Sequence, residues 1–273
     1  MVLRRGSTGE AVRVLQRRLE DRNFPPGLID GDFGPATEAA VRAFQASEGL
    51  LVDGVVGRFT LAALDLADAI DGEPPYDLSL VTPRLVSEIV LFEHVGTIQR
   101  NLPAILEALE AFDLATRDLV AMALGTIVAE VGGLEPIAER TSRFNTSPQG
   151  HPFDLYDFRT DLGNGARGDG ARFRGRGYVQ LTGRDNYARF GRRIGLGDAL
   201  LDDPDRANEP DIAARLLAAF LAEHRVRILD ALRRDDLRTA RRAVNGGTHG
   251  LDRFSDAFRR ARRVLPPEAE TGG

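Results

Sequence analysis

Residues 172–187 read RFRGRGYVQLTGRDNY and form the most informative stretch of the chain. Glycines and arginines alternate in its first half, and three polar, uncharged side chains follow at Gln180, Thr182 and Asn186. Glycine permits close backbone approach, and amide and hydroxyl groups form hydrogen bonds without carrying charge. The stretch therefore predicts a glycine-rich binding segment for a neutral ligand with many hydroxyl groups, such as a carbohydrate.

The composition is that of a soluble globular protein of 273 residues, 42% of them hydrophobic and 28% charged. This length is sufficient for two domains. The net charge of −5 argues against a nucleic-acid-binding protein. The absence of cysteine excludes disulfides and thiolate chemistry. The four histidines have no HExxH or other close ligand spacing, so we expect neither a metal nor another cofactor.

The first residues, MVLRRGSTGEAV, are basic but lack the apolar core of a secretory signal. No run in the sequence approaches the roughly 20 apolar residues that span a bilayer. We therefore expect synthesis in the cytoplasm without a signal peptide, and no insertion into a membrane. We also expect a monomer.

An internal repeat marks the N-terminal part of the chain. Residues 30–37 (DGDFGPAT) and 53–60 (DGVVGRFT) share the pattern D-G-x-x-G-x-x-T, and each copy runs into apolar residues at helical spacing. Asp-Gly favours a turn, and the threonine can cap or open a helix. Upstream, Ser7 and Glu10 fit a capping box. We predict three short helices that form a small bundle in residues 1–68.

The remainder of the chain predicts a linker, a larger helical domain and a tail. Residues 69–83 contain a Pro-Pro pair and form the expected linker, and Thr82-Pro83 is a typical helix start. The second domain, residues 84–266, has helical apolar spacing in five segments, at 85–92, 102–112, 119–131, 211–232 and 237–244. Its best strand signal is at 178–181. We therefore predict a mainly α fold, followed by a tail at 267–273.

Three glutamates are candidates for acid–base chemistry. Glu130 lies in the segment AEVGG, where two glycines end a predicted helix and the neighbours are mostly apolar. Such surroundings favour a protonated carboxyl, which a general acid requires, although a solvent-facing glutamate at a helix end is an equal alternative. Glycoside hydrolysis needs a second carboxylate, for which Glu135 and Glu139 are available.

Two family resemblances follow from these motifs. The opening LRRGSTGEAVRVLQRRL and the block GDFGPATEAAVRAFQ, between Leu3 and about Leu66, resemble the peptidoglycan-binding domain type 1 family. Four further motifs, AEVGG, TSRFNTSPQGHPFDLYDFRTDLGN, GDGARFRGRGYVQLTGRDNY and AVNGGTHGLDRF, resemble glycoside hydrolase family 19 from about 119 to 254. The resemblances imply a cell-wall anchor joined to a lysozyme-like helical domain with an inverting mechanism.

The second resemblance also implies residue roles. Glu130 matches the general acid, although the family's H-E-T/S-G-G block reads AEVGG here, without the histidine and the hydroxyl residue. Glu139 matches the base that activates water, and Glu135 is a weaker substitute. The expected substrate-binding residues are Gln180, Thr182, Asn186, Asn245, Tyr156, Arg159 and Tyr178, with Tyr156, Tyr178 and Tyr187 as possible sugar-stacking faces. The arginines between 167 and 193 are expected to face anionic wall polymers.

The resulting hypothesis is a cell-wall lytic glycoside hydrolase, of the endolysin type, that cleaves β-1,4 bonds of peptidoglycan glycan strands. The enzyme would reach the wall after release by a phage holin-type protein or by another export route. One alternative is a chitinase that acts on polymers of β-1,4 N-acetylglucosamine. Another is a wall-binding protein without catalytic activity, and a third is an amidase, against which the missing zinc ligands count.

Overall fold

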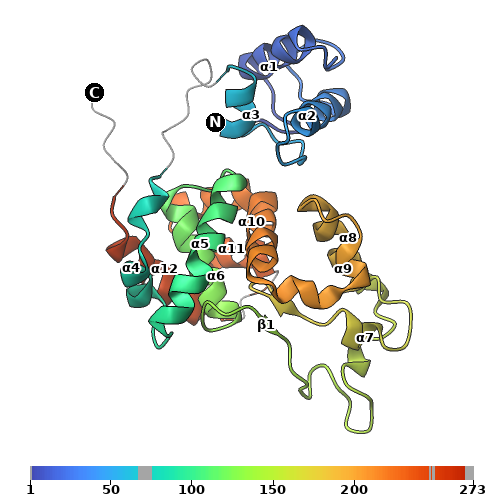
Figure 1. Ribbon diagram of the computed structural model, residues 1–273, viewed down its shortest axis with the longest axis vertical. Helices are drawn as coiled ribbons and strands as arrows, with labels where there is room; N and C mark the ends of the chain where they lie inside the picture. Colours follow the sequence, from blue (N-terminus) through green and yellow to red (C-terminus); the bar gives the residue numbers. More distant parts are fainter. Residues whose placement is uncertain (1, 67–75, 246, 248–249, 268–273) are drawn as a thin grey trace. The chain divides into compact units, whose positions relative to one another are not determined.

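The computed structural model describes residues 2–66, 76–245, 247 and 250–267, and the chain divides into two compact units, Met1–Pro75 and Tyr76–Gly273 (Figure 1). Both units consist mainly of helices, which confirms the predicted fold class. Among the described residues the single sheet has two short strands. None of the helices in these residues is both long and apolar enough to cross a bilayer.

The smaller unit contains three helices, α1 (Glu10–Asp21), α2 (Pro35–Ser47) and α3 (Arg58–Ala63). Their apolar faces share one core, to which α1 contributes Leu15 and Leu19 and α2 contributes Phe44. The spacing of these residues is that of an amphipathic helix buried on one face. The predicted three-helix bundle is therefore confirmed.

A buried glutamine holds each copy of the repeat in the smaller unit. The Nε2 of Gln16 donates to Asp30 Oδ1 at 3.1 Å and to Thr37 Oγ1 at 3.2 Å, while its Oε1 accepts from the backbone of Gly31 at 2.8 Å. The second copy repeats these contacts with Gln45, whose Nε2 donates to Asp53 Oδ1 at 2.9 Å. The two turns are thus fixed by the same set of hydrogen bonds.

Two sequence-based expectations about helix capping in the smaller unit are not met. Thr37 is buried inside α2 and does not cap it, because its hydroxyl is bonded to Gln16 and to the carbonyl of Pro26. The capping box predicted at Ser7 is also wrong. Gly9 is the N-cap of α1, and the Ser7 hydroxyl accepts from the backbone of Arg4 instead.

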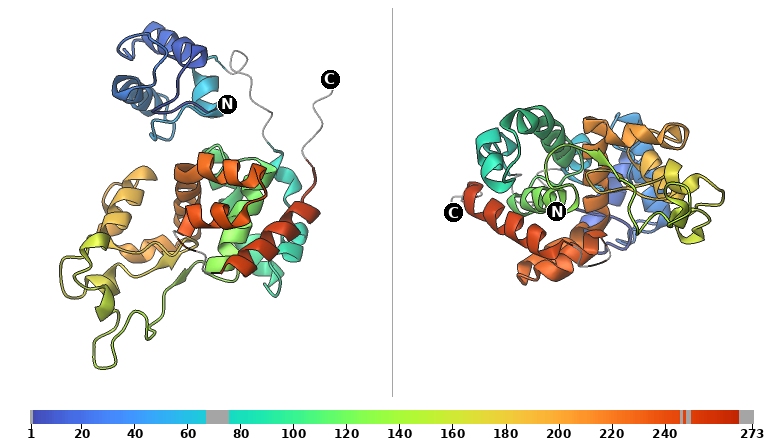
Figure 2. Two further views of the ribbon diagram at one scale, coloured as in Figure 1. Left: turned by 180° about the vertical axis from the view of Figure 1, so that it is seen from behind. Right: turned by 90° about the horizontal axis from the view of Figure 1, so that it is seen from below.

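The larger unit is built around one buried helix, α6 (Arg117–Glu130), of whose 14 residues ten are buried. A helix that is apolar on all sides needs neighbours on all sides. In Figures 1 and 2, α6 lies among the other long helices of this unit. These are α4 (Pro83–Ile89), α5 (Val95–Ala111), α10 (Pro210–Arg233), α11 (Leu237–Asn245) and α12 (Leu251–Val264). The close approach of α12 requires Gly125, since a Cβ there would lie 3.1 Å from the Phe254 ring.

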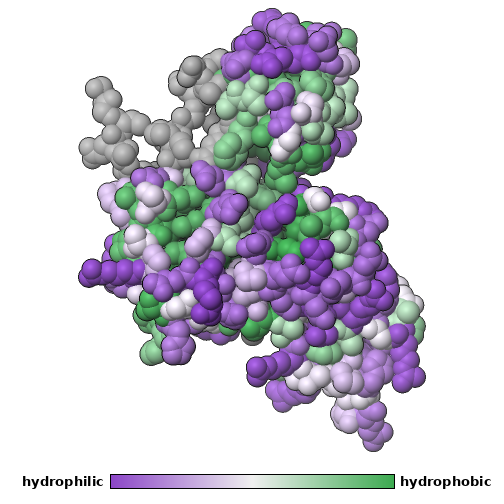
Figure 3. All heavy atoms as spheres, in the orientation of Figure 1, coloured by the Kyte–Doolittle hydropathy of each residue, from purple (hydrophilic) through white to green (hydrophobic). Residues whose placement is uncertain are grey.

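A second group of elements forms a side lobe next to this bundle. It contains α7 (Asp169–Arg172), α8 (Arg184–Arg193) and α9 (Ala199–Asp202), with the strands β1 (Ile137–Ala138) and β2 (Arg176–Gly177) at its base (Figure 1). Four 3-10 helices complete the unit, at Leu78–Leu80, Asp154–Tyr156, Thr160–Leu162 and Pro204–Asn208. On the face seen in Figure 3 the surface of the side lobe is mostly hydrophilic.

One boundary differs from the sequence-based expectation. Residues 76–83 were predicted to be linker, but they belong to the larger unit, where the backbone N–H of Tyr76 donates to the Ala115 carbonyl at 2.9 Å. The helix start at Thr82-Pro83 is confirmed, because the Thr82 hydroxyl caps α4. Residues 69–75 of the expected linker and 268–273 of the expected tail lie outside the described residues.

The predicted strand at 178–181 is wrong. The strand of this segment is β2, which pairs antiparallel with β1, and residues 178–181 form a turn that returns to it. Backbone hydrogen bonds of 2.9 and 3.2 Å between Arg176 and Leu181 close this turn. Gln180 adopts a left-handed backbone conformation inside it, with φ of 50°. Tyr178 and Leu181 are buried because the turn is covered, and not because it is a strand, while Val179 is only partly buried.

Candidate active site

The segment between the two strands, residues 139–175, forms a long loop that we call the site loop. Pairing of β1 with β2 brings its two ends together, and the backbone N–H of Glu139 donates to the Gly175 carbonyl at 2.8 Å. The glycine-rich stretch noted in the sequence is therefore placed directly beside one of the three candidate glutamates.

The Glu139 carboxylate accepts hydrogen bonds from three uncharged groups. Asn145 Nδ2 and the Tyr156 hydroxyl each donate to Oε1 at 2.9 Å, and the backbone N–H of Gly175 donates to Oε2 at 3.2 Å. An ionised carboxylate is purely an acceptor, so these donors match its charged form without neutralising its charge. The arrangement fixes the position of both oxygens.

Tyr156 is suited to this donor role over a wide pH range. Its partial burial and the nearby negative charge of Glu139 raise the pKa of Tyr156 to about 12. The hydroxyl therefore keeps its proton at any pH at which the enzyme would work. The backbone of Tyr156 is held in turn, because its carbonyl accepts from Asn164 Nδ2 at 2.8 Å.

Two of the predicted substrate-binding side chains converge with Glu139 on Gly175. A Cβ added to Gly175 would lie 2.9 Å from Gln180 Oε1, 3.2 Å from Glu139 Oε2 and 3.3 Å from Thr182 Oγ1. A side chain at this position would therefore displace three polar groups at once. The lack of a side chain at Gly175 lets these three groups approach the backbone closely, as the sequence indicated. Glu139, Gln180, Thr182 and Tyr156 thus form one polar cluster.

The other predicted binding residues lie in different settings. Asn186 follows in α8, where its Nδ2 donates to the Thr182 carbonyl at 2.8 Å. Arg159 is exposed and forms a salt bridge with Asp161 at 2.5 Å. Asn245 is the last residue of α11, and its side chain lies outside the described residues.

Two tyrosines that were expected to offer stacking faces are fully buried. The ring of Tyr178 has no exposed surface and its hydroxyl donates to the Leu134 carbonyl at 2.9 Å. Tyr187 is likewise buried, and its hydroxyl donates to the Arg174 carbonyl at 2.7 Å. The expectation that Tyr178 contacts substrate is therefore corrected. Its ring supports the turn from behind and cannot meet a sugar.

Glu130 ends α6 and has a charged partner. Its Oε1 accepts from Nη2 of Arg241 at 2.6 Å, and the Arg241 side chain is fully buried while that of Glu130 is 18% exposed. The expectation of a mostly apolar setting for Glu130 is thus incomplete. Arg241 could not be selected from the sequence, because it lies 111 positions away on the amphipathic helix α11 and looks there like an ordinary surface arginine.

Glu135 differs from Glu139 in exposure and in its contacts. Its side chain is 59% exposed and its carboxylate lies 3.1 Å from Asn101 Nδ2 and 3.8 Å from Arg100 Nη2. Glu139 by contrast is held by three donors inside the site loop. Asn145, one of those donors, lies in the family 19-like motif TSRFNTSPQGHPFDLYDFRTDLGN. Nothing about this asparagine by itself was a reason to select it from the sequence.

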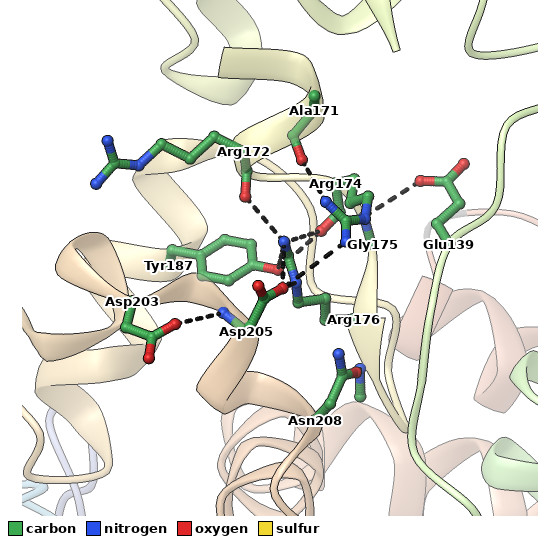
Figure 4. A network of polar contacts seen from close by, with 11 residues as sticks. Glu139, Ala171, Arg172, Arg174, Gly175, Arg176, Tyr187, Asp203, Asp205 and Asn208 are labelled. Carbon is green, nitrogen blue, oxygen red and sulfur yellow. Dashed lines mark hydrogen bonds and ion pairs between the residues drawn. The ribbon is translucent and has the colours of Figure 1, made fainter. Parts of the chain in front are cut away.

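A buried arginine anchors the strand behind the cluster. The Nε of Arg176 donates to Asp205 at 2.8 Å, and its Nη1 donates to the Tyr187 hydroxyl at 2.9 Å and to the Arg172 carbonyl at 2.9 Å (Figure 4). Arg176 is 2% exposed, so it does not face wall polymers as the arginine-rich sequence suggested. It holds β2, and with it Gly175, in place.

Acidic side chains organise the rest of the site loop. Asp157 accepts from the backbone N–H groups of Gly168 at 3.0 Å and Gly170 at 2.8 Å. Asp169 accepts from the backbone of Gly165 at 2.9 Å, and Asp154 accepts from that of Ser147 at 2.7 Å. A segment with little regular structure needs such partners for its backbone. Within the described part of the chain, no group of three or more His, Asp or Glu residues could hold a metal ion.

Comparison with known proteins identifies the smaller unit. Residues 8–64 match the family described as "Putative peptidoglycan binding domain". This unit is a peptidoglycan-binding domain. The D-G-x-x-G-x-x-T repeat and its two buried glutamines lie within the matched residues of this peptidoglycan-binding domain.

Two curated relatives cover different parts of the chain. Zinc D-Ala-D-Ala carboxypeptidase of Streptomyces albus G is 51% identical over 63 residues, which are 21% of this chain and 24% of that protein. The glycosyl hydrolase family 19 domain-containing protein of Haemophilus influenzae is 31% identical over 105 residues, 38% of this chain and 48% of that protein. The chain thus spans less than half the length of either relative.

The family 19 relative is similar to more than the peptidoglycan-binding domain. An alignment of 105 residues is longer than the whole unit Met1–Pro75, so the similarity extends into the larger unit. Among solved structures, that of the Burkholderia AP3 phage endolysin is 21% identical and aligns over 96% of this chain and 100% of that chain, with a TM-score of 0.26.

Proposed function

We propose that the protein is a cell-wall hydrolase whose larger unit cleaves β-1,4 glycosidic bonds of peptidoglycan. The observation that carries this proposal is the polar cluster on Gly175, in which Glu139 lies beside Gln180 and Thr182. A carboxylate with fixed oxygens, a hydroxyl and an amide in one place can bind and orient both a sugar and a water molecule. The family 19 relative and the peptidoglycan-binding domain support the same class of substrate.

The proposed reaction uses two carboxyl groups. Glu139 acts as general base and takes a proton from a water that attacks the anomeric carbon, and Thr182 helps to position that water. Glu130 acts as general acid and protonates the departing glycosidic oxygen. The water adds to the face opposite the leaving group, so the configuration of the anomeric carbon is inverted. Arg241 orients the carboxyl group of Glu130 through the hydrogen bond to Oε1.

The peptidoglycan-binding domain supplies the second part of the proposal. An insoluble polymer presents few cleavable bonds per volume, and a tethered domain raises the local substrate concentration. Deletion of residues 1–69 should therefore lower activity on intact cell walls more than activity on soluble oligosaccharides. Equal losses on both substrates would contradict the anchoring role.

The direct experiment is to incubate the purified full chain with purified peptidoglycan and, in parallel, with chitin. Release of reducing sugar from peptidoglycan, with fragments identified by mass spectrometry, is the expected result. Cleavage of chitin alone would assign the protein to the chitinases. If the chain cuts neither polymer but sediments with peptidoglycan, it is a wall-binding protein and the enzymatic proposal is wrong. Release of free stem peptides would indicate an amidase.

A further inference from the structure

Among the described residues, eight other than glycine have a left-handed backbone, and half of these have an ordinary explanation. Four are aspartate or asparagine, and each comes two positions after the end of a helix: Asn23, Asp65, Asp113 and Asp235. A left-handed residue at this place commonly terminates a helix, and Asn and Asp tolerate it. These four therefore carry no functional information.

The other four are bulky residues of the larger unit, namely Phe92, Phe153, Phe158 and Gln180. Gln180 belongs to the polar cluster. Phe153 is buried, with its ring 6.4 Å from that of Tyr156 and 5.7 Å from the guanidinium carbon of Arg174. Packing around the buried ring therefore accounts for the left-handed backbone of Phe153. Phe92 and Phe158 remain, and their rings are exposed to solvent.

Phe158 lies on the site loop, two residues after the Tyr156 that donates to Glu139, and its side chain is 63% exposed at a φ of 56°. The left-handed region is a true outlier for a bulky residue and is energetically unfavourable. An aromatic ring left in water also forgoes the stabilisation of burial. Two unfavourable features thus coincide at one residue of the loop that carries the candidate base. Outliers of this kind cluster at functional sites.

The residues on both sides of Phe158 hold it in this conformation. The Asp157 carboxylate is 4% exposed and is bonded to the backbone of Gly168 and Gly170. On the other side the Arg159 carbonyl accepts from the backbone N–H of Asn164 at 3.0 Å. Because the backbone is fixed on both sides, the ring stays in solvent instead of folding back onto the protein. Its position is thus determined before any ligand arrives.

A sugar ring is the partner that fits this position. The carbon-bound hydrogens of a pyranose form an apolar face that packs on an aromatic ring, and the chain has no tryptophan to provide one. Tyr178 and Tyr187 are buried and cannot serve. We propose that Phe158 binds the apolar face of an N-acetylated pyranose of the glycan, in a subsite next to Glu139. This inference rests on the proposed glycosidase function.

The test compares three substitutions in the full chain. Phe158→Asn removes the ring and fits the left-handed backbone, Phe158→Tyr keeps an aromatic ring, and Leu80→Ala removes an exposed apolar side chain that precedes α4. Each is made in the Glu130→Gln background, and binding of soluble N-acetylglucosamine oligosaccharides is measured by calorimetry. The same three changes are made in the active enzyme to obtain KM and kcat, and thermal unfolding of every variant is recorded.

We expect Phe158→Asn to weaken oligosaccharide binding and raise KM about tenfold, the effect of losing part of one aromatic contact, with little change in kcat. Its unfolding midpoint should equal or exceed that of the parent, because Asn relieves the backbone strain. Phe158→Tyr and Leu80→Ala should bind within about twofold of the parent.

Unchanged binding in Phe158→Asn would overturn the subsite. A lowered unfolding midpoint together with weaker binding would also overturn it, since Phe158 would then be structural. If the unsubstituted enzyme cleaves neither peptidoglycan nor chitin, the proposed function fails, and the subsite fails with it. An active enzyme with an unaffected Phe158→Asn variant contradicts the subsite alone.

Discussion

Glu139 and Glu130 are carboxylates of the same unit, but their hydrogen-bond donors differ in charge. Glu139 receives three uncharged donors from its own loop, two from side chains and one from the backbone of Gly175. Glu130 receives the guanidinium of Arg241, a fully buried cation from a different helix. At Glu139 the uncharged donors fix the position of the negative charge without compensating it. At Glu130 the positive charge of Arg241 compensates it.

The difference shows how one unit can prepare two identical groups for different tasks. A base needs an available negative charge, and uncharged donors preserve it while they fix the geometry. Glu130 is instead held by a guanidinium that is anchored on a different helix and fixes the position of its carboxyl group through the hydrogen bond to Oε1. The two glutamates therefore differ in the charge of their hydrogen-bond donors and not in their own chemistry.

The largest expected effect comes from removing the charge at either position. Glu130→Gln and Glu139→Gln should each lower the rate of glycan cleavage by about 10²–10⁴, the usual range for loss of a general acid or base. Binding to insoluble peptidoglycan should persist, because it depends on the other unit. Turbidity loss of cell-wall suspensions and co-sedimentation measure the two properties.

Glu135→Gln is the matched control for this experiment, since Glu135 is a nearby but exposed carboxylate. It should retain nearly full activity. A larger loss at Glu135 than at Glu139 would transfer the role of base to Glu135. Substantial remaining activity in Glu130→Gln would remove Glu130 from the mechanism.

An intermediate effect is expected from Arg241→Met, which removes the cation and leaves Glu130 without it. The free energy of unfolding should fall by about 2 kcal/mol, less than for a wholly buried pair because Glu130 is 18% exposed. Urea denaturation measures this change. In the double variant Glu130→Gln/Arg241→Met the loss should be smaller than the sum of the single losses. Simple additivity would show that the two side chains do not stabilise each other.

The smallest expected effect is that of Tyr156→Phe, which removes one of the three donors to Glu139. Two donors remain, so kcat should fall only about three- to tenfold, as for the loss of a hydrogen bond that contributes about 1 kcal/mol. A loss as large as that of Glu139→Gln would mean that the hydroxyl has a direct catalytic role.

The variant Tyr156→Phe should also differ from the parent in how its stability changes at alkaline pH. Folding raises the pKa of Tyr156 from its ordinary 10.0 to about 12, so the folded state retains a proton that the unfolded chain loses. This contribution to stability is complete below about pH 10 and declines as the pH rises toward 12. Tyr156→Phe should therefore lose less stability than the parent between pH 9 and about 11, as urea denaturation would reveal.

Periodic and glycine-marked features of the molecule were accessible from sequence. The three helices of the peptidoglycan-binding domain follow from apolar spacing, and the meeting of Gln180 and Thr182 with Glu139 agrees with the motifs that contain them. Features decided by tertiary contact were not accessible. The burial of Tyr178 and the pairing of Glu130 with Arg241 depend on which distant surfaces meet, and local pattern carries no information on this.

The acidic groups that hold the site loop have a consequence for inactivation by acid. Hydrogen bonds from Ser147 lower the pKa of Asp154, and although burial acts against it, Arg184 with two backbone N–H groups also lowers the pKa of Asp169. Their support is present at neutral pH and is lost as the pH falls through these lowered values. The loop that orients Glu139 would then lose backbone partners and loosen, whereas the core of the helical bundle is held by apolar contacts that acid does not alter. Acid would thus act on the site loop as a local melting before the whole molecule denatures.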